Sequence, residues 1–208
     1  MPLSPSAPRE LIHTRAIECL GYRRADGLWE IEARIRDTKT YPFKNRWRGE
    51  VAPGNALHDM QVRLTIDENF TIHEAEATTD ASPHRICPEA APPMAALKGL
   101  RIAPGWMKAV KAKLGGTHGC THLVELLGPM ATTAFQTLYP VLAKRAAEAP
   151  PDARPRMIDS CYAWSAERDL IREFYPTHYT GPGPQPGADL GGTTAADHGA
   201  TTAKGTAS

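Results

Sequence analysis

Residues 61–67 carry the sequence QVRLTID, and residues 70–78 carry FTIHEAEAT. In the first run, Val62, Leu64 and Ile66 alternate with polar side chains, which is the period of a half-buried strand. The tripeptide Asp67-Glu68-Asn69 between the two runs is typical of a turn. We therefore predict an antiparallel β-hairpin over these two runs.

A second hairpin is predicted before it, from strands over residues 10–23 and 28–36. The turn signal between them is Ala25-Asp26-Gly27, because glycine permits a positive φ. In the second strand the predicted buried side carries Trp29, Ile31, Ala33 and Ile35. The segment 37–57, which contains Pro42, Pro53 and Gly54, is predicted to be irregular.

Helical patterns follow the strands. The predicted helices cover Pro88–Leu97, Gly105–Leu114, a longer segment from Cys120, and Ala166–Phe174, with a last strand over Met157–Trp164. The long helix has an apolar stripe of Leu123, Leu127, Met130, Ala134 and Leu138, and Pro129 is expected to kink it or to start a new segment after Gly128. Strands followed by helices indicate an α+β fold, with an antiparallel sheet and helices packed on one face.

Composition divides the chain into three parts. Residues 1–8 are rich in proline and are predicted to be a disordered lead, and residues 9–175 a single α+β domain. Residues 176–208 are predicted to be a disordered tail rich in Gly, Pro, Ala and Thr.

The balance of acidic and basic residues bears on whether the chain binds polyanions. The 208 residues include 24 basic and 23 acidic side chains, and the formal net charge is +1. This balance gives no general attraction to nucleic acid or to an anionic membrane. There is no apolar run long enough to span a bilayer and no secretory signal at the start, so we expect a cytoplasmic protein. The oligomeric state is left open.

Four widely spaced cysteines, Cys19, Cys87, Cys120 and Cys161, form no CxxC pair. In a reducing cytoplasm a disulfide framework is not expected. Each cysteine is therefore a core residue, a metal ligand or a reactive thiol. Cys19 and Cys161 fit the core interpretation, and Cys87 fits either a core or a ligand role.

The strongest chemical signal is the segment Gly115–His122, GGTHGCTH. It holds His118, Cys120 and His122 on a glycine-rich loop that opens a helix. A helix N-terminus carries positive potential, which favours a thiolate, and thiolate with imidazole suits zinc, iron or copper. The segment lacks the CxxC pair of a zinc finger and the Gly-Lys-Ser/Thr ending of a P-loop, and the chain has no GxSxG elbow.

Other segments offer further ligands for the same site. Cys87 precedes a predicted helix, and His58 and Asp59 precede a predicted strand. We predict Cys87, Cys120, His122 and His58 as metal ligands, with zinc or iron as the metal. Asp59 is predicted to be a ligand or a general base beside Cys120, because a carboxylate near a metal can deprotonate bound water.

A basic and aromatic cluster is the remaining feature. It comprises Lys39, Lys44, Arg46 and Arg48, interleaved with Tyr41, Phe43 and Trp47. Such a cluster suits a nucleotide, a CoA-like phosphate or an aromatic acid. The balanced net charge favours the alternative that it is a solvated loop.

Three runs carry a family resemblance. They are Asp26–Glu30, His58–Asp67 and Gly119–Leu123, with the sequences DGLWE, HDMQVRLTID and GCTHL. In these runs the chain resembles bacterial proteins of the family called domain of unknown function 2889, over roughly residues 9–175. The family name implies no activity.

A more distant likeness concerns the layout. A hairpin, a cysteine at a loop-to-helix junction and a cysteine at a second helix start are similar to the NifU/IscU and SufE group of iron–sulfur scaffolds. In that group Cys, Asp and His residues gather at one end of the sheet and hold zinc or a nascent cluster. By position, Cys87 resembles the first cluster cysteine and Cys120 the last, whereas the middle cysteine has no counterpart. The resemblance implies a NifU/SufE-like fold and a mononuclear metal or a single working thiol.

Three functions remain open from the sequence. The first is a metal-binding domain acting as a small-molecule metalloenzyme of bacterial catabolism, with an acid or a CoA thioester as its substrate. The second is a non-enzymatic carrier of metal or sulfur, for which Cys120 is the acceptor. The third is a metal-free thiol enzyme in which Cys120 is the nucleophile and a histidine is the base.

Overall fold

The computed structural model describes residues 3–150 and 152–183. The chain divides into two compact units, Met1–Ala143 and Lys144–Ser208. The predicted domain over residues 9–175 spans both units and stays a prediction, as does the disordered lead. Most of the predicted tail lies outside the described residues, although its first residues, Pro176–His178, form a 3₁₀ helix, η4.

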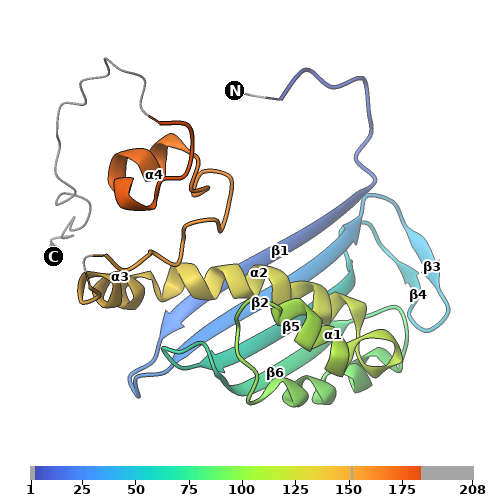
Figure 1. The fold of residues 1–208 in the computed structure, drawn as a ribbon. Helices are drawn as coiled ribbons and strands as arrows, with labels where there is room; N and C mark the ends of the chain where they lie inside the picture. Colours follow the sequence, from blue (N-terminus) through green and yellow to red (C-terminus); the bar gives the residue numbers. More distant parts are fainter. Residues whose placement is uncertain (1–2, 151, 184–208) are drawn as a thin grey trace, which may run out of the picture. The chain divides into compact units, whose positions relative to one another are not determined.

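The first unit contains a four-stranded antiparallel sheet in the order β1-β2-β5-β6 (Figure 1). The strands are β1 (His13–Arg23), β2 (Trp29–Lys39), β5 (Ala56–Ile66) and β6 (Ile72–Ala81). Both predicted hairpins are confirmed, because β1 pairs with β2 and β5 pairs with β6. The α+β class with an antiparallel sheet is confirmed as well.

The segment predicted to be irregular, residues 37–57, is mostly ordered. It contains the end of β2, the start of β5 and a small hairpin of β3 (Phe43–Asn45) and β4 (Gly49–Val51). The strands of this hairpin are too short to show an alternating pattern in the sequence, which is why the prediction missed them.

The helices that lie within the first unit cover one face of the sheet. They are η1 (Cys87–Ala90), η2 (Pro92–Leu97), α1 (Trp106–Leu114), η3 (Gly116–His118) and α2 (Thr121–Thr137). The next helix, α3 (Tyr139–Ala147), crosses the boundary between the two units. The predicted α-helix over Pro88–Leu97 is wrong, since two 3₁₀ helices replace it. Its prolines supply no N–H to an α-helical hydrogen-bond ladder.

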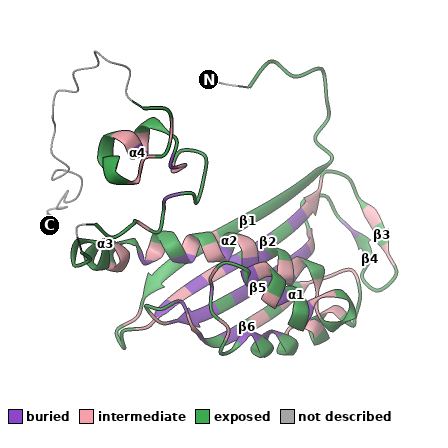
Figure 2. Ribbon diagram, in the orientation of Figure 1, coloured by how far each residue is buried: buried purple, intermediate pink, exposed green. Residues whose placement is uncertain are grey.

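The core lies between the sheet and these helices, and Figure 2 shows the buried residues on that face. From the sheet it takes the alternating side chains of β2 and β5, such as Ile31, Ile35 and Leu64. From the helices it takes the predicted stripes of α1 and α2, which are buried along their whole length. The apolar face of the sheet therefore packs against the apolar faces of the helices, as predicted.

Pro129 neither ends nor begins α2, which runs without interruption from Thr121 to Thr137. The prediction of a new segment after Gly128 is therefore wrong. Buried side chains on both sides of the proline, among them Leu126 and Met130, hold α2 against the sheet and outweigh one missing hydrogen bond.

The other face of the sheet is charged. Arg34 pairs with Asp59, and Arg63 pairs with Glu32 and Glu76. These side chains alternate with the core residues of the same strands, so the period of the strand fixes which face each one occupies.

The second unit has a small core of Ile158, Ala166 and Ile171 beside α4 (Asp169–Phe174). The predicted strand over Met157–Trp164 is wrong, because these residues form turns. Asp159 adopts a positive φ of 66°, and its carboxylate accepts a hydrogen bond from the Ala166 N–H at 2.9 Å, which closes the turn.

In the part of the chain that the structure describes, no helix is both long and apolar enough to cross a bilayer.

Candidate metal centre

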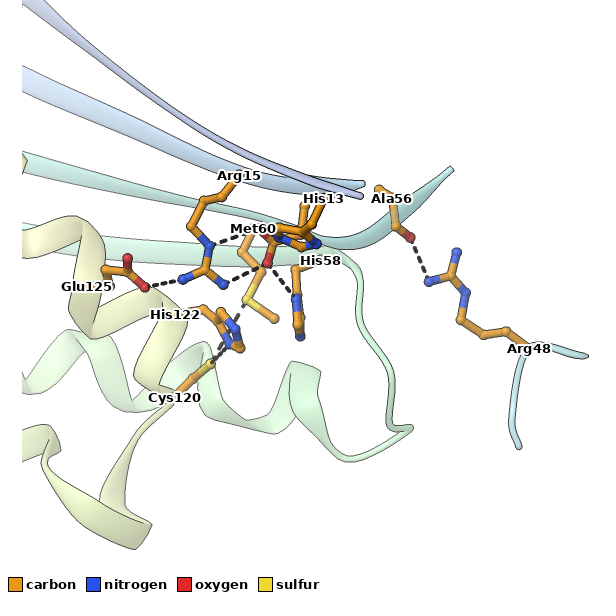
Figure 3. A network of polar contacts seen from close by, with 10 residues as sticks. His13, Arg15, Arg48, Ala56, His58, Met60, Cys120, His122 and Glu125 are labelled. Atoms are coloured by element: carbon orange, nitrogen blue, oxygen red, sulfur yellow. Dashed lines mark hydrogen bonds and ion pairs between the residues drawn. The ribbon is translucent and has the colours of Figure 1, made fainter. Parts of the chain in front are cut away.

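The Asp37 carboxylate lies at one end of β2 with only 1% of the residue exposed. Arg15 of β1 donates to both of its oxygens, from Nε at 2.8 Å and from Nη2 at 2.8 Å. His13 Nε2 lies 3.3 Å from Oδ1, and His58 Nδ1 lies 2.8 Å from Oδ2 (Figure 3). The four contacts occupy about all the acceptor positions that a carboxylate has.

His58 lies directly across from Asp37 in the β2–β5 pairing. A carboxylate can only accept a hydrogen bond, so Nδ1 of His58 carries a proton and Nε2 is the ring nitrogen that takes no part in this bond. This hydrogen bond also fixes the ring, which is buried with 8% of the residue exposed. His58 is therefore held as a ligand or base with Nε2 as its free atom.

His122 comes from the first turn of α2, and Cys120 is the N-cap residue of that helix. The His122 ring stacks on the His58 ring with centroids 3.8 Å apart, and its Nδ1 lies 3.7 Å from Cys120 Sγ. Burial lowers the pKa of His122, and the nearby charges of His58 and Arg15 lower it further. His122 is thus favoured as the neutral imidazole, which is the form that binds metals.

One group of candidate metal ligands is found among the described residues: Asp37, His58 and His122. Each offers one ligand atom within 4.8 Å of the others. Cys120 is not a member of this group, although its thiol contacts His122 and lies 4.0 Å from Met60 Sδ. The thiol therefore lies at the border of the group, on the side of α2.

Arg15 sets the electrostatics of the site. Burial alone would raise the pKa of Asp37, but the hydrogen bonds and charges of Arg15 and His58 hold it well below its usual range. The hydrogen bond from Arg15 to Asp37 raises the arginine pKa, and Glu125 of α2 accepts from Arg15 Nη1 at 2.7 Å. Asp37 is therefore ionised, and Arg15 connects β1, β2 and α2.

Of the predicted ligands, the structure brings His58, His122 and Cys120 together. Cys87 begins η1, is half-buried and is absent from the ligand group seen in the described ranges. Asp59 forms a bidentate ion pair with Arg34, at 2.7 and 2.6 Å, on the charged face of the sheet. It follows His58 in β5, and consecutive residues of a strand point to opposite faces.

Sequence reasoning missed Asp37, Arg15, His13 and Glu125. For Asp37 a signal existed, because it continues the buried alternation of β2 by one further step beyond Ile35. A carboxylate at a buried position requires a partner, which marks it as part of a site. Nothing in the sequence indicated that Arg15 of β1 would be that partner.

The family model described as "Protein of unknown function (DUF2889)" matches residues 13–136. The chain belongs to this family. The match spans every residue of the cluster around Asp37, from His13 to Glu125. No curated protein and no solved structure matches the chain, so the resemblance to the NifU/IscU and SufE group gains no support and its fold assignment stays a hypothesis.

Proposed function

We propose that the chain is a transition-metal-binding domain that acts as a small-molecule metalloenzyme, with zinc or iron held by His58, His122 and Cys120. The observation that supports it best is the pair of stacked imidazoles beside a thiol, one of them anchored by an ionised carboxylate. Two imidazoles and one thiolate form a ligand set that leaves a position open for water or substrate.

Asp37 and Cys120 both qualify by residue type as the third ligand. Asp37 already accepts four contacts, two of them from the Arg15 guanidinium. Direct ligation would bring a metal cation close to this guanidinium. We therefore assign Asp37 the role of orienting His58, as carboxylates do behind many metal-bound histidines, and Cys120 the role of ligand.

When bound, such a metal lowers the pKa of bound water or polarises a substrate oxygen. The chain itself supplies the orientation: Asp37 fixes the tautomer of His58, and the start of α2 places His122 and Cys120 over the end of the sheet. Met60 and the neighbouring core side chains lie beneath and limit the access of water from that side.

The test is metal content by elemental analysis, with cobalt substitution as a second readout. We expect near-stoichiometric zinc or iron in wild type, loss in His58→Ala and Cys120→Ser, and a thiolate-to-cobalt absorption band that Cys120→Ser removes. Asp37→Asn should retain the metal with affinity lower by roughly 10–100-fold. The reverse pattern, metal lost in Asp37→Asn and kept in Cys120→Ser, assigns Asp37 as the ligand.

Absence of metal in every sample, after anaerobic purification with zinc or iron supplied, would exclude the metalloenzyme. The rate at which a chelator removes the metal separates it from a carrier. A catalytic site is expected to hold its metal, whereas a carrier for metal or sulfur is expected to release it to a protein partner.

A metal-free thiol enzyme is the second candidate, favoured by the 3.7 Å contact between Cys120 Sγ and His122 Nδ1. The imidazole is within reach to take the thiol proton, so Cys120 can act as a nucleophile. This candidate predicts that alkylation abolishes activity and that chelators leave it unchanged. Cys161→Ala, which removes an exposed thiol from the second unit, is the control.

A further inference from the structure

The β3–β4 hairpin and the segment before η1 carry several exposed cations. We define the basic hairpin surface by its members: Lys44, Arg46, Trp47, Arg48 and Arg85. Four of these five side chains are cationic, and the fifth is a tryptophan.

Trp47 organises this surface. The guanidinium carbons of Arg46 and Arg85 lie 5.2 and 5.0 Å from the centroid of its ring. Stacking on an indole orients a guanidinium without using its N–H groups. Trp47 therefore holds two cations from different segments near each other with their donors available.

Asn45 fixes the backbone beneath them. Its Oδ1 accepts from the backbone N–H groups of Trp47 and Arg48, at 2.9 and 3.0 Å, which closes the turn between β3 and β4. Its Nδ2 donates to the Pro83 carbonyl at 3.0 Å and so connects the hairpin to the segment that carries Arg85. The two guanidiniums are thus placed by the fold before any ligand binds, which reduces the entropy cost of binding.

The two guanidiniums on Trp47 have no acidic partner in the described part of the chain. Within the described residues, no carboxylate forms an ion pair with Lys44, Arg46 or Arg85, whereas Arg34 and Arg63 on the sheet both have acidic partners. Oriented guanidiniums with unused donors match a phosphate group, which accepts bidentate hydrogen bonds and carries more charge than one carboxylate.

The surface adjoins the candidate metal centre. The hairpin is the connection between β2, which ends just after Asp37, and β5, which begins just before His58. Arg48 Nη1 donates to the Ala56 carbonyl at 2.8 Å, two residues before His58 (Figure 3). The hairpin is therefore joined through β5 to the strand end that carries His58.

We propose that the basic hairpin surface binds the phosphate group of a small-molecule substrate whose reacting part lies at the His58–His122–Cys120 site. The location of the reacting part rests on the proposed function, but phosphate binding does not. The balanced net charge of the chain argues for a small molecule over a nucleic acid, because only a local patch of cations is available.

The experiment titrates inorganic phosphate into the full-length protein at low ionic strength and follows the heat of binding. We expect saturable binding that weakens by at least about tenfold in Arg46→Gln/Arg85→Gln, because two charge-assisted contacts are lost. The matched control is Lys108→Gln/Lys113→Gln on α1, which removes the same charge from exposed positions and should bind phosphate as wild type does. Circular dichroism checks that both variants are folded.

Three results would overturn the proposal: no saturable phosphate binding, equal weakening in both double variants, or equally tight binding of acetate. Much tighter binding of a single-stranded oligonucleotide would instead assign the surface to nucleic acid. His58→Ala separates the two proposals, since it should lose the metal and keep phosphate binding. Absence of metal from the wild type refutes the metalloenzyme alone, and absence of saturable phosphate binding by the wild type refutes the hairpin site alone.

Discussion

Replacement of Asp37 by Asn tests the polar network at the end of the sheet. The side chain keeps its size, but it loses its charge and can no longer accept from Arg15 at both ends. Breaking a fully buried ion pair by removing one partner costs about 3–5 kcal/mol. Arg15 has a side-chain exposure of 34% and keeps Glu125 as a partner, so solvent compensates part of the loss. We expect the free energy of unfolding to fall by about 2–3 kcal/mol.

The assay is urea unfolding of chelator-treated protein, followed by far-UV circular dichroism. The control is Asp59→Asn, which removes a carboxylate of the same bidentate type from the charged face. Asp59 and its partner Arg34 have side-chain exposures of 11% and 48%, both higher than those of Asp37 and Arg15, so the expected loss is smaller than for Asp37→Asn. Equal losses in the two variants, or a loss below about 1 kcal/mol for Asp37→Asn, would refute the structural role given to this carboxylate.

Three further predictions concern the first unit. In Gly21→Ala the new Cβ clashes with the Thr137 side chain of α2, so the free energy of unfolding should fall by about 1–3 kcal/mol. Adding Thr137→Gly should restore part of this loss. No recovery in the double variant would exclude the contact with Thr137 as the cause. Leu126→Ala should cost about 2–5 kcal/mol by urea unfolding, because the side chain is fully buried, and a loss below 1 kcal/mol contradicts its core position. Burial raises the pKa of Asp67, but backbone N–H groups and a histidine lower it overall, so its stabilisation is complete above the unfolded pKa of about 4 and is lost as the pH falls below it. The stability difference between wild type and Asp67→Asn should therefore shrink below pH 4, and a constant difference would contradict this.

Much of the fold was predictable, because buried apolar residues recur about every 2 residues in a strand and about every 3.6 residues in a helix. The alternation of Trp29, Ile31 and Ile35 gave the face of β2 that is buried, and the spacing of Trp106, Val110 and Leu114 gave the face of α1. The prediction failed in the segment 88–97, where a proline at a helix start and further prolines inside the segment favour different structures. We predicted one α-helix from Pro88, whereas the segment forms two 3₁₀ helices.

Local patterns were enough to predict the strand and helix faces and to mark His58, Cys120 and His122 as residues able to bind a metal. Which of these candidates meet depends on the tertiary packing. His58 joins His122 because β5 lies under the start of α2, while Asp59, its neighbour in the chain, points to the opposite face. The physical reason is that periodicity is local, whereas the meeting of one strand end, one helix start and the Arg15–Asp37 pair depends on how the whole core packs.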